Sequence, residues 1–313
     1  MVYLTLKLHH LTSKNFADLV RESSEHLPDA DTIKMLEGKG TEETVLYILG
    51  ILTPEGRMVG FGMYASGPWD PILKPGYADV TIKVDQDWYH QGVGNWLLDE
   101  IETLARERHS KALQTMVRDN NDVELDWVNQ KGFEITNHSF ESRLNVKMFD
   151  IHSYDALFKN LEASGIKFTS LAEYTQDPDI EHQFWDFWWK LVQDVPGMSD
   201  KPRPDNEKMM NMTRDVDKEG FILAVDDGTW VAMSMAIDES EGVVYNSMTG
   251  VDRRYRGKGL AQAVKVKAIE YALKNDAEYM RTHNDSENEA MLSVNEKLGY
   301  ERRPGIFGLT KLI

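Results

Sequence analysis

The fold is decided by one stretch of the sequence, Val251-Asp252-Arg253-Arg254-Tyr255-Arg256-Gly257-Lys258-Gly259-Leu260-Ala261. An apolar, strand-like run over 243–251 leads into it, and a helical pattern over 260–273 follows directly. The loop therefore combines two glycines, four basic side chains and the unpaired backbone N–H groups of a helix start. This combination predicts a phosphate-binding site, where glycine lets the ligand approach the main chain closely.

Two common nucleotide-binding loops do not fit this stretch. A P-loop requires Ser or Thr after its Gly-Lys pair, but Gly259 follows Lys258. The dinucleotide-binding fingerprint requires a third glycine at the position of Gln262. The phosphate therefore belongs to another kind of ligand.

The loop resembles motif A of the GNAT superfamily of acetyl-CoA-dependent N-acetyltransferases, Gln/Arg-x-x-Gly-x-Gly/Ala. The match runs from Arg256 through Gly259 to Ala261. Further residues resemble the closing motif of that superfamily: Asn284, Asn288, Met291, Leu292, Asn295, Leu298, Gly299 and Tyr300. Their spacing, with Thr282 upstream, is most similar to the tandem branch that includes mycothiol synthase.

The resemblance implies a binding site for acetyl-CoA as co-substrate. The first loop would hold the pyrophosphate, the strand before it would pair with the pantetheine arm, and an asparagine near the second helix would touch that arm. A backbone N–H near Thr249 would stabilise the oxyanion, and Gly250 could mark a β-bulge. The implied binding residues are Thr249, Gly250, Val251, Arg256, Gly257, Lys258, Gly259, Leu260, Ala261 and Asn288.

The sequence also contains an internal repeat. Val84 and Val251, Asn121 and Asn288, Gly132 and Gly299, and Phe140 and Phe307 are each separated by 167 residues. We therefore predict an α/β fold of two tandem GNAT-like domains, each a mixed, mostly antiparallel sheet flanked by helices. The predicted bounds are 1–146, a connector at 147–166, and 167–313; the first domain is expected to begin with a strand at 4–8 and a helix at 13–26.

The two copies of the loop differ in charge. The second copy has Arg253, Arg254, Arg256 and Lys258 where the first has Gln86, Asp87, Tyr89 and Gln91. Because CoA carries about four negative charges, the second domain is predicted to be the catalytic one. The first copy is interpreted as a degenerate scaffold, with a second, weak CoA site as the alternative, since Gly92 and Gly94 are retained.

The catalytic candidates are weaker. In the family a tyrosine often protonates the leaving thiolate, but Asn295 stands at that position and cannot serve as an acid. Tyr245 ranks first as a proton relay, although such a strand residue is more often structural. The run Phe184, Trp185, Phe187, Trp188 and Trp189 either packs in a core or lines an acceptor pocket.

Composition limits the partners. The 313 residues include no cysteine and carry a net charge of −17, from 35 basic and 52 acidic residues. The absence of cysteine excludes a cysteine nucleophile and a Cys-based metal site, and the nine histidines show no metal-binding spacing, so no metal is expected. The acidity disfavours nucleic acid, and no signal peptide or membrane span is visible. We expect a cytoplasmic monomer or homodimer.

These features predict an N-acetyltransferase that moves an acetyl group to a small-molecule amine by direct attack in a ternary complex. A peptide or protein amino-terminal acetyltransferase is the alternative within enzymes. The alternative outside enzymes is a non-catalytic acyl-CoA sensor, which the asparagine at position 295 leaves open.

Overall fold

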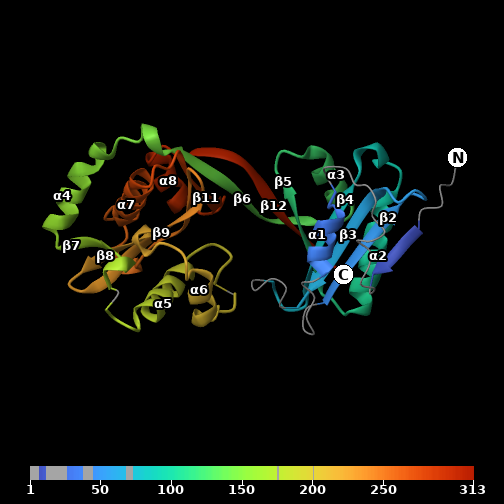
Figure 1. Ribbon diagram of the computed structural model, residues 1–313, viewed down its shortest axis with the longest axis horizontal. Coiled ribbons are helices and arrows are strands. Elements are labelled where there is room, and N and C mark those ends of the chain that lie inside the picture. Colours follow the sequence, from blue (N-terminus) through green and yellow to red (C-terminus); the bar gives the residue numbers. More distant parts are fainter. Residues whose placement is uncertain (1–6, 12–26, 38–44, 68–72, 175, 200) are drawn as a thin grey trace. The chain divides into compact units, whose positions relative to one another are not determined.

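The computed structural model describes residues 7–11, 27–37, 45–67, 73–174, 176–199 and 201–313 (Figure 1). The chain forms two compact units. The first comprises residues 1–136 and 307–313, and the second comprises 137–306. The expected helix at 13–26 lies outside the described residues, whereas the expected strand at 4–8 overlaps β1 (Lys7–Leu11).

The bounds of these units differ from the predicted domain bounds because the closing strands are exchanged. The strand order is β1-β2-β3-β4-β5-β12-β6-β11-β10-β9-β8-β7. β6 (Glu134–Asn145) ends the first copy, yet from Ser139 onward it pairs with β11 of the second copy. β12 (Glu301–Leu312) ends the second copy, yet it neighbours β5 in the sheet. A repeat in the sequence identifies equivalent strands but does not say which copy each strand joins.

In the first unit, a long helix packs closely against the sheet. The strands are β2 (Val45–Leu52), β3 (Met58–Ser66), β4 (Tyr77–Val84) and β5 (Ala112–Arg118), and the helices are α1 (Ala30–Glu37), α2 (Val93–Glu107) and α3 (Asp122–Gln130). A Cβ at Gly60 of β3 would lie 2.7 Å from Val93 Cγ1 of α2. Glycine there allows α2 to bury Leu97 and Ile101 in the core.

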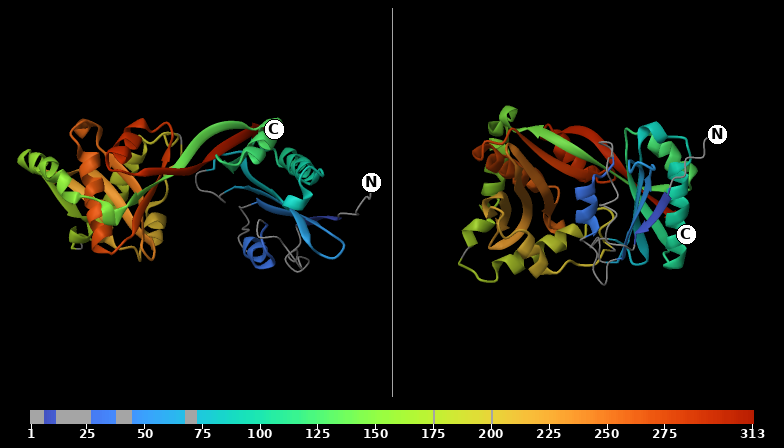
Figure 2. Two further views of the ribbon diagram at one scale, coloured as in Figure 1. Left: turned by 90° about the horizontal axis from the view of Figure 1, so that it is seen from above. Right: turned by 45° about the vertical axis from the view of Figure 1, so that its right-hand side comes forward.

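In the second unit, helices cover both faces of the sheet (Figures 1 and 2). The strands are β7 (Ile166–Ser170), β8 (Phe221–Asp226), β9 (Thr229–Ser240), β10 (Val243–Val251) and β11 (Tyr279–Asp285), and the helices are α4 (Asp155–Ala163), α5 (Ile180–Val192), α6 (Asn206–Met212), α7 (Leu260–Lys274) and α8 (Glu289–Lys297). α7 packs on Val244 and Met280, whereas α5 packs on Phe221 and Met233.

The aromatic run on α5 is mainly core. Phe184, Trp185 and Phe187 are buried against β8 and β9, which confirms the packing interpretation for these three. Trp188 and Trp189 are only partly buried.

β10 and β11 separate shortly after they meet. They pair in parallel only from Val243 to Tyr245, and Tyr245 is opposite Arg281. Beyond that point β9 is the partner of β10 among the described strands, after a β-bulge between Asn246 and Met248. β4 and β5 also pair over just three residues, Tyr77 to Asp79. Seven other strand pairs are antiparallel: β1–β2, β2–β3, β3–β4, β7–β8, β8–β9, β9–β10 and β6–β11. The mixed, mostly antiparallel sheet and flanking helices of the prediction are confirmed.

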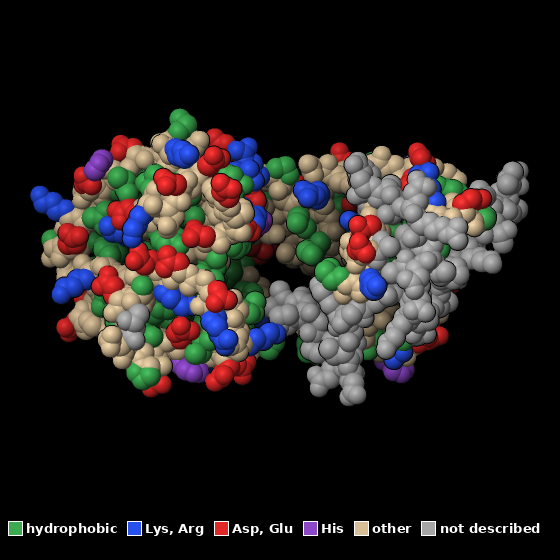
Figure 3. Space-filling model, in the orientation of Figure 1, with side chains coloured by type: hydrophobic (Ala, Val, Ile, Leu, Met, Phe, Trp, Pro, Cys, Tyr) green, Lys and Arg blue, Asp and Glu red, His purple; other side chains and the backbone are tan. Residues whose placement is uncertain are grey.

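Acidic and basic side chains are interspersed over the face of the second unit shown in Figure 3. No helix in the described ranges is long and apolar enough to cross a membrane.

Candidate functional site

The phosphate-type loop lies between β10 and α7, as the sequence predicts. Asp252 begins a short 3-10 turn, Arg253–Tyr255, by accepting a hydrogen bond from the N–H of Arg254 at 3.0 Å. Gly257 and Gly259 then adopt φ angles of 76° and 83°. These are left-handed conformations that glycine adopts most easily, so both glycines are also required by the backbone itself.

The start of α7 is open to an anion. Gly259 is its N-cap residue, and no described side chain caps it. The N–H groups of the first turn therefore carry the positive end of the helix dipole without a protein acceptor. Leu260 is buried in the core and Ala261 packs against it, so of these two predicted residues only the backbone can serve a ligand.

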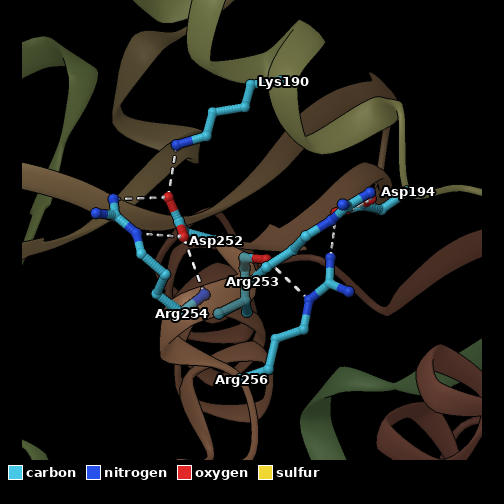
Figure 4. A network of polar contacts seen from close by, with 7 residues as sticks. Lys190, Asp194, Asp252, Arg253, Arg254 and Arg256 are labelled. Carbon is cyan, nitrogen blue, oxygen red and sulfur yellow. Dashed lines mark hydrogen bonds and ion pairs between the residues drawn. The ribbon is translucent and has the colours of Figure 1, made fainter.

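The three arginines of the loop are held by two carboxylates (Figure 4). Arg253 donates to Asp194 at 2.9 Å, and Arg256 pairs with the same carboxylate while also donating to the carbonyl of Val251 at 3.2 Å. Arg254 Nε and Lys190 Nζ lie 3.2 and 2.5 Å from Asp252. The charges of the loop are thus oriented before any ligand arrives.

Electrostatics follow from this network. Hydrogen bonds from Arg254 and then from Lys190 hold the pKa of Asp252 well below its usual range, and Arg253 lowers the pKa of Asp194. Four cations pair with these two carboxylates, and Lys258 adds a fifth positive charge to the loop, so the loop keeps an excess of positive charge. Lys258 lies over the ring of Tyr255, 4.8 Å from its centroid. Sequence reasoning missed Lys190 and Asp194, because both lie on or just after α5, remote in sequence from the loop.

The first copy forms the same loop without these cations. Asp85 accepts from the N–H of Asp87 at 3.0 Å, and Gly92 begins α2 with a φ of 88°. A cleft of about 830 Å³ lies beside this loop. It is lined in part by Lys83, Arg118 and Lys131, which come from other elements and which a comparison of the loops alone could not identify.

The predicted pantetheine strand has one open edge. Thr249, Gly250 and Val251 pair with Ser234, Met233 and Ala232 of β9, and no described strand pairs with their other side. Gly250 does not mark the bulge, which lies at Ser247. A Cβ at Gly250 would lie 2.9 Å from Leu191 Cβ, so glycine is needed there because α5 packs directly on the strand.

Asn288 has a structural role. Its side chain accepts a hydrogen bond from the N–H of Met291 at 3.2 Å and caps α8. Asn121 caps α3 in the same way, through Glu124. Contact between Asn288 and pantetheine stays a prediction. The side-chain NH2 group of Asn288 would make that contact, because its oxygen already caps the helix.

Tyr245 lies next to a residue that sequence reasoning missed. Its ring centroid is 5.8 Å from that of His283 and 5.2 Å from Arg281 Cζ. Burial raises the pKa of Tyr245, so its hydroxyl is a weak proton acceptor at neutral pH. Partial burial and the charge of Arg281 lower the pKa of His283, which keeps its imidazole neutral and able to accept a proton.

Asn295 is buried, 2 % exposed, and donates to Asn284 Oδ1 at 2.5 Å. Its own Oδ1 has no hydrogen-bond partner in the described part of the chain. An amide cannot release a proton near neutral pH, so Asn295 has no acid role. No cluster of three metal-binding side chains occurs among the described residues.

Comparisons with known proteins agree with this geometry. Residues 184–300 match the sequence model of the Acetyltransferase (GNAT) family. The tandem GNAT protein from the clavulanic acid biosynthesis pathway is similar over 98 % of both chains, with 17 % identity and a TM-score of 0.64. A GCN5-related N-acetyltransferase from Sphaerobacter thermophilus is similar over 91 % of this chain and 85 % of its own, with 16 % identity and a TM-score of 0.64. No curated protein sequence matches the chain.

The second unit therefore contains a GNAT-family domain, and the chain as a whole has the tandem GNAT fold. The match over residues 184–300 supports acyl-CoA-dependent acetyl transfer in general. The relation to the mycothiol synthase branch stays a prediction.

Proposed function

We propose that the protein is an acetyl-CoA-dependent N-acetyltransferase whose acceptor is a small-molecule amine. One observation carries the proposal: the uncapped start of α7, surrounded by an excess of cations, directly follows a strand with an open edge. The helix start supplies N–H donors and positive charge for a pyrophosphate, and the open strand edge supplies backbone hydrogen-bonding groups for the amides of an extended arm.

The residues fit acetyl-CoA in two places. The N–H groups that follow Gly257 and Gly259, with Arg256 and Lys258, would hold the phosphates. The outward backbone groups of Thr249 to Val251 would hydrogen-bond the pantetheine arm as an added strand would. A backbone N–H of this edge, near Thr249, is the proposed donor to the oxyanion.

Bound acetyl-CoA would supply a thioester, whose acetyl group the amine takes by direct attack in a ternary complex. The chain has no cysteine, so no cysteine acyl-enzyme can form. We propose that His283, rather than Tyr245, accepts the proton released by the amine, because its imidazole is neutral and it lies on β11 just past the point where β10 departs. Protonation of the thiolate by the protein is not required, since a free thiol has a pKa of about 8.5.

The strand exchange brings first-copy residues to this face. Glu141 of β6 is opposite His283, and it accepts a hydrogen bond from Arg281 at 2.9 Å. Arg281 also pairs with Glu239 of β9. Glu141 also pairs with Arg143, so the two carboxylates and the two arginines beside His283 balance in charge.

The test is a panel of amines, including small amines, amino sugars and peptides with free amino termini, with free-thiol release as the readout. Turnover on small amines supports the proposal. Turnover on peptides alone would favour an amino-terminal acetyltransferase, and binding of CoA without thiol release on any acceptor would favour a sensor. A cytoplasmic location and a monomeric or homodimeric state belong to the same proposal.

The first copy is proposed to be a scaffold. Its loop lacks the cations of the second copy, and Trp127 covers part of the start of α2, where a Cβ at Gly94 would lie 3.3 Å from the indole. Because basic residues line its cleft, the alternative is a second, weaker CoA site in the first copy. Titration with CoA distinguishes the two, since a scaffold gives one site per chain.

A further inference from the structure

A lysine is buried in the core of the second unit without a carboxylate partner. Lys265 of α7 is 1 % exposed, and it forms no ion pair among the described residues. Its Nζ donates to Asn246 Oδ1 at 2.5 Å and lies 4.9 Å from the ring centroid of Tyr300. Burial lowers the pKa of Lys265 to about 7. A buried lysine of this kind destabilises a fold, so its presence requires a reason.

Asn246 connects this lysine to the bulge of β10. Its amide nitrogen donates to Ser234 Oγ and to the carbonyl of Met235, both at 2.9 Å, and to the carbonyl of Met248 at 3.4 Å. Its oxygen accepts from Thr249 Oγ1 at 3.2 Å as well as from Lys265. Asn246 therefore joins β9 to both sides of Ser247, where the strand is irregular and its pairing with β11 has ended.

The first copy shows what the same place looks like without this network. Leu98 and Lys265 are each the sixth residue after the loop glycine. Parallel pairing ends at Asp79 in β4 and at Tyr245 in β10, so the next residues, Val80 and Asn246, are equivalent. Ile82 pairs with Gly62 as Thr249 pairs with Ser234, so these two pairs are also equivalent. All four equivalents lack a polar side chain, and β3 and β4 pair without a register shift. The buried network and the bulge occur together, in the copy that carries the cationic loop.

We propose that Lys265 is a positioning residue for acetyl transfer, which acts through Asn246 to fix the bulge at Ser247 and the open edge that follows it. This inference rests on the proposed function. β-bulges are frequent beside active sites, where they end pairing and redirect backbone groups. A displaced edge would misplace the oxyanion donor relative to the thioester while leaving the phosphate loop intact.

The experiment compares Lys265→Met with wild type and with Leu98→Met, the same substitution at the equivalent position of the first copy. For K265M we expect a melting temperature no lower than that of wild type, a KM for acetyl-CoA within about threefold, and a kcat lower by about tenfold to a hundredfold. L98M should leave kcat unchanged. Lys265→Gln, which keeps a neutral donor toward Asn246, should recover part of the lost kcat.

Three results would overturn the inference. They are an unchanged kcat in K265M, a loss of kcat that parallels a fall in melting temperature, and a K265Q variant no more active than K265M. If K265M proves insoluble, Thr249→Val, which removes only one hydroxyl from the network, must lower kcat without changing the affinity for CoA. Wild type that transfers acetyl to no amine would overturn the proposed function as well, whereas active wild type with an equally active K265M would overturn only the role of Lys265.

Discussion

Asp252 and Asp85, 167 residues apart, perform the same structural task in the two copies. Each is nearly fully buried, and each accepts a hydrogen bond at 3.0 Å from the N–H two residues further on. Each also pairs with a cation, Lys190 at 2.5 Å for Asp252 and Arg57 at 2.9 Å for Asp85. The frame of the loop is therefore independent of the arginines that follow it in the second copy. Charge can be changed on this frame without loss of the fold.

The first prediction concerns these charges. Replacing Arg256 with Tyr and Lys258 with Gln copies the first-copy loop onto the second. We expect about tenfold weaker binding of acetyl-CoA, because two exposed phosphate contacts are together worth about 1–2 kcal/mol. Calorimetric titration measures this, and wild-type affinity should also fall as salt rises. Equal affinity in the variant and wild type would show that the loop does not hold the phosphates.

The second prediction concerns His283. His283→Gln should lower kcat by about a hundredfold, the usual worth of a general base, with little change in the KM for acetyl-CoA. Because the pKa of His283 is lowered, the wild-type rate should fall only on the acid side of neutrality, where the imidazole becomes protonated. That acid limb should be absent from the residual activity of the variant.

The matched control is His152→Gln, which removes an exposed imidazole that lies 3.6 Å from Asp155. It should keep both the rate and the pH profile of wild type. An H283Q variant with an unchanged acid limb would assign that limb, and the proton transfer, to another group.

The third prediction links Lys265 to pH. Its pKa is about 7 in the folded state, against an ordinary value of 10.5. Between these two values the unfolded chain binds a proton that the folded chain does not, so ionisation of Lys265 costs no stability above about pH 10.5, and the cost grows as pH falls to about 7. A tenfold change in proton affinity corresponds to about 1.4 kcal/mol. The melting temperature of K265M should therefore exceed that of wild type most at pH 7 and least near pH 10, in paired scans. A difference that does not change with pH would mean that Lys265 stays charged in the core.

The loop and the repeat could be predicted from the sequence because both depend on local backbone requirements. Gly259 must adopt a positive φ at a helix start, and the same requirement recurs at Gly92. Asn288 and Asn121 mark helix starts for a similar local reason. The tandem fold class followed from these features and is confirmed.

The remaining features depend on pairing between distant segments. The repeat could not show that β6 joins β11, because Phe140 and Phe307 are equivalent in sequence whichever sheet each enters. A single histidine on a strand, such as His283, belongs to no recognisable motif. Nothing in the sequence near Asp194 indicates that it contacts Arg253. Lys265 lies on the buried side of α7. Because lysine side chains are almost always exposed, its burial could not be predicted from the sequence.

The most direct test compares two substitutions at equivalent glycines, Gly259→Asp and Gly92→Asp. Both place a carboxylate at a helix start with a φ above 80°, so the backbone strain is similar. They differ in room: a Cβ at Gly259 would lie 2.8 Å from Leu157 Cδ1, the end of a flexible side chain, whereas a Cβ at Gly92 has nothing within 4 Å, so binding of CoA is measured beside turnover. Free-thiol release with the best amine acceptor is measured for each variant and for wild type, after circular dichroism has shown that both are folded. We predict that G259D loses detectable turnover and that G92D keeps nearly all of it. Full activity in G259D, with loss of turnover in G92D, would contradict the assignment of acetyl-CoA to the second copy.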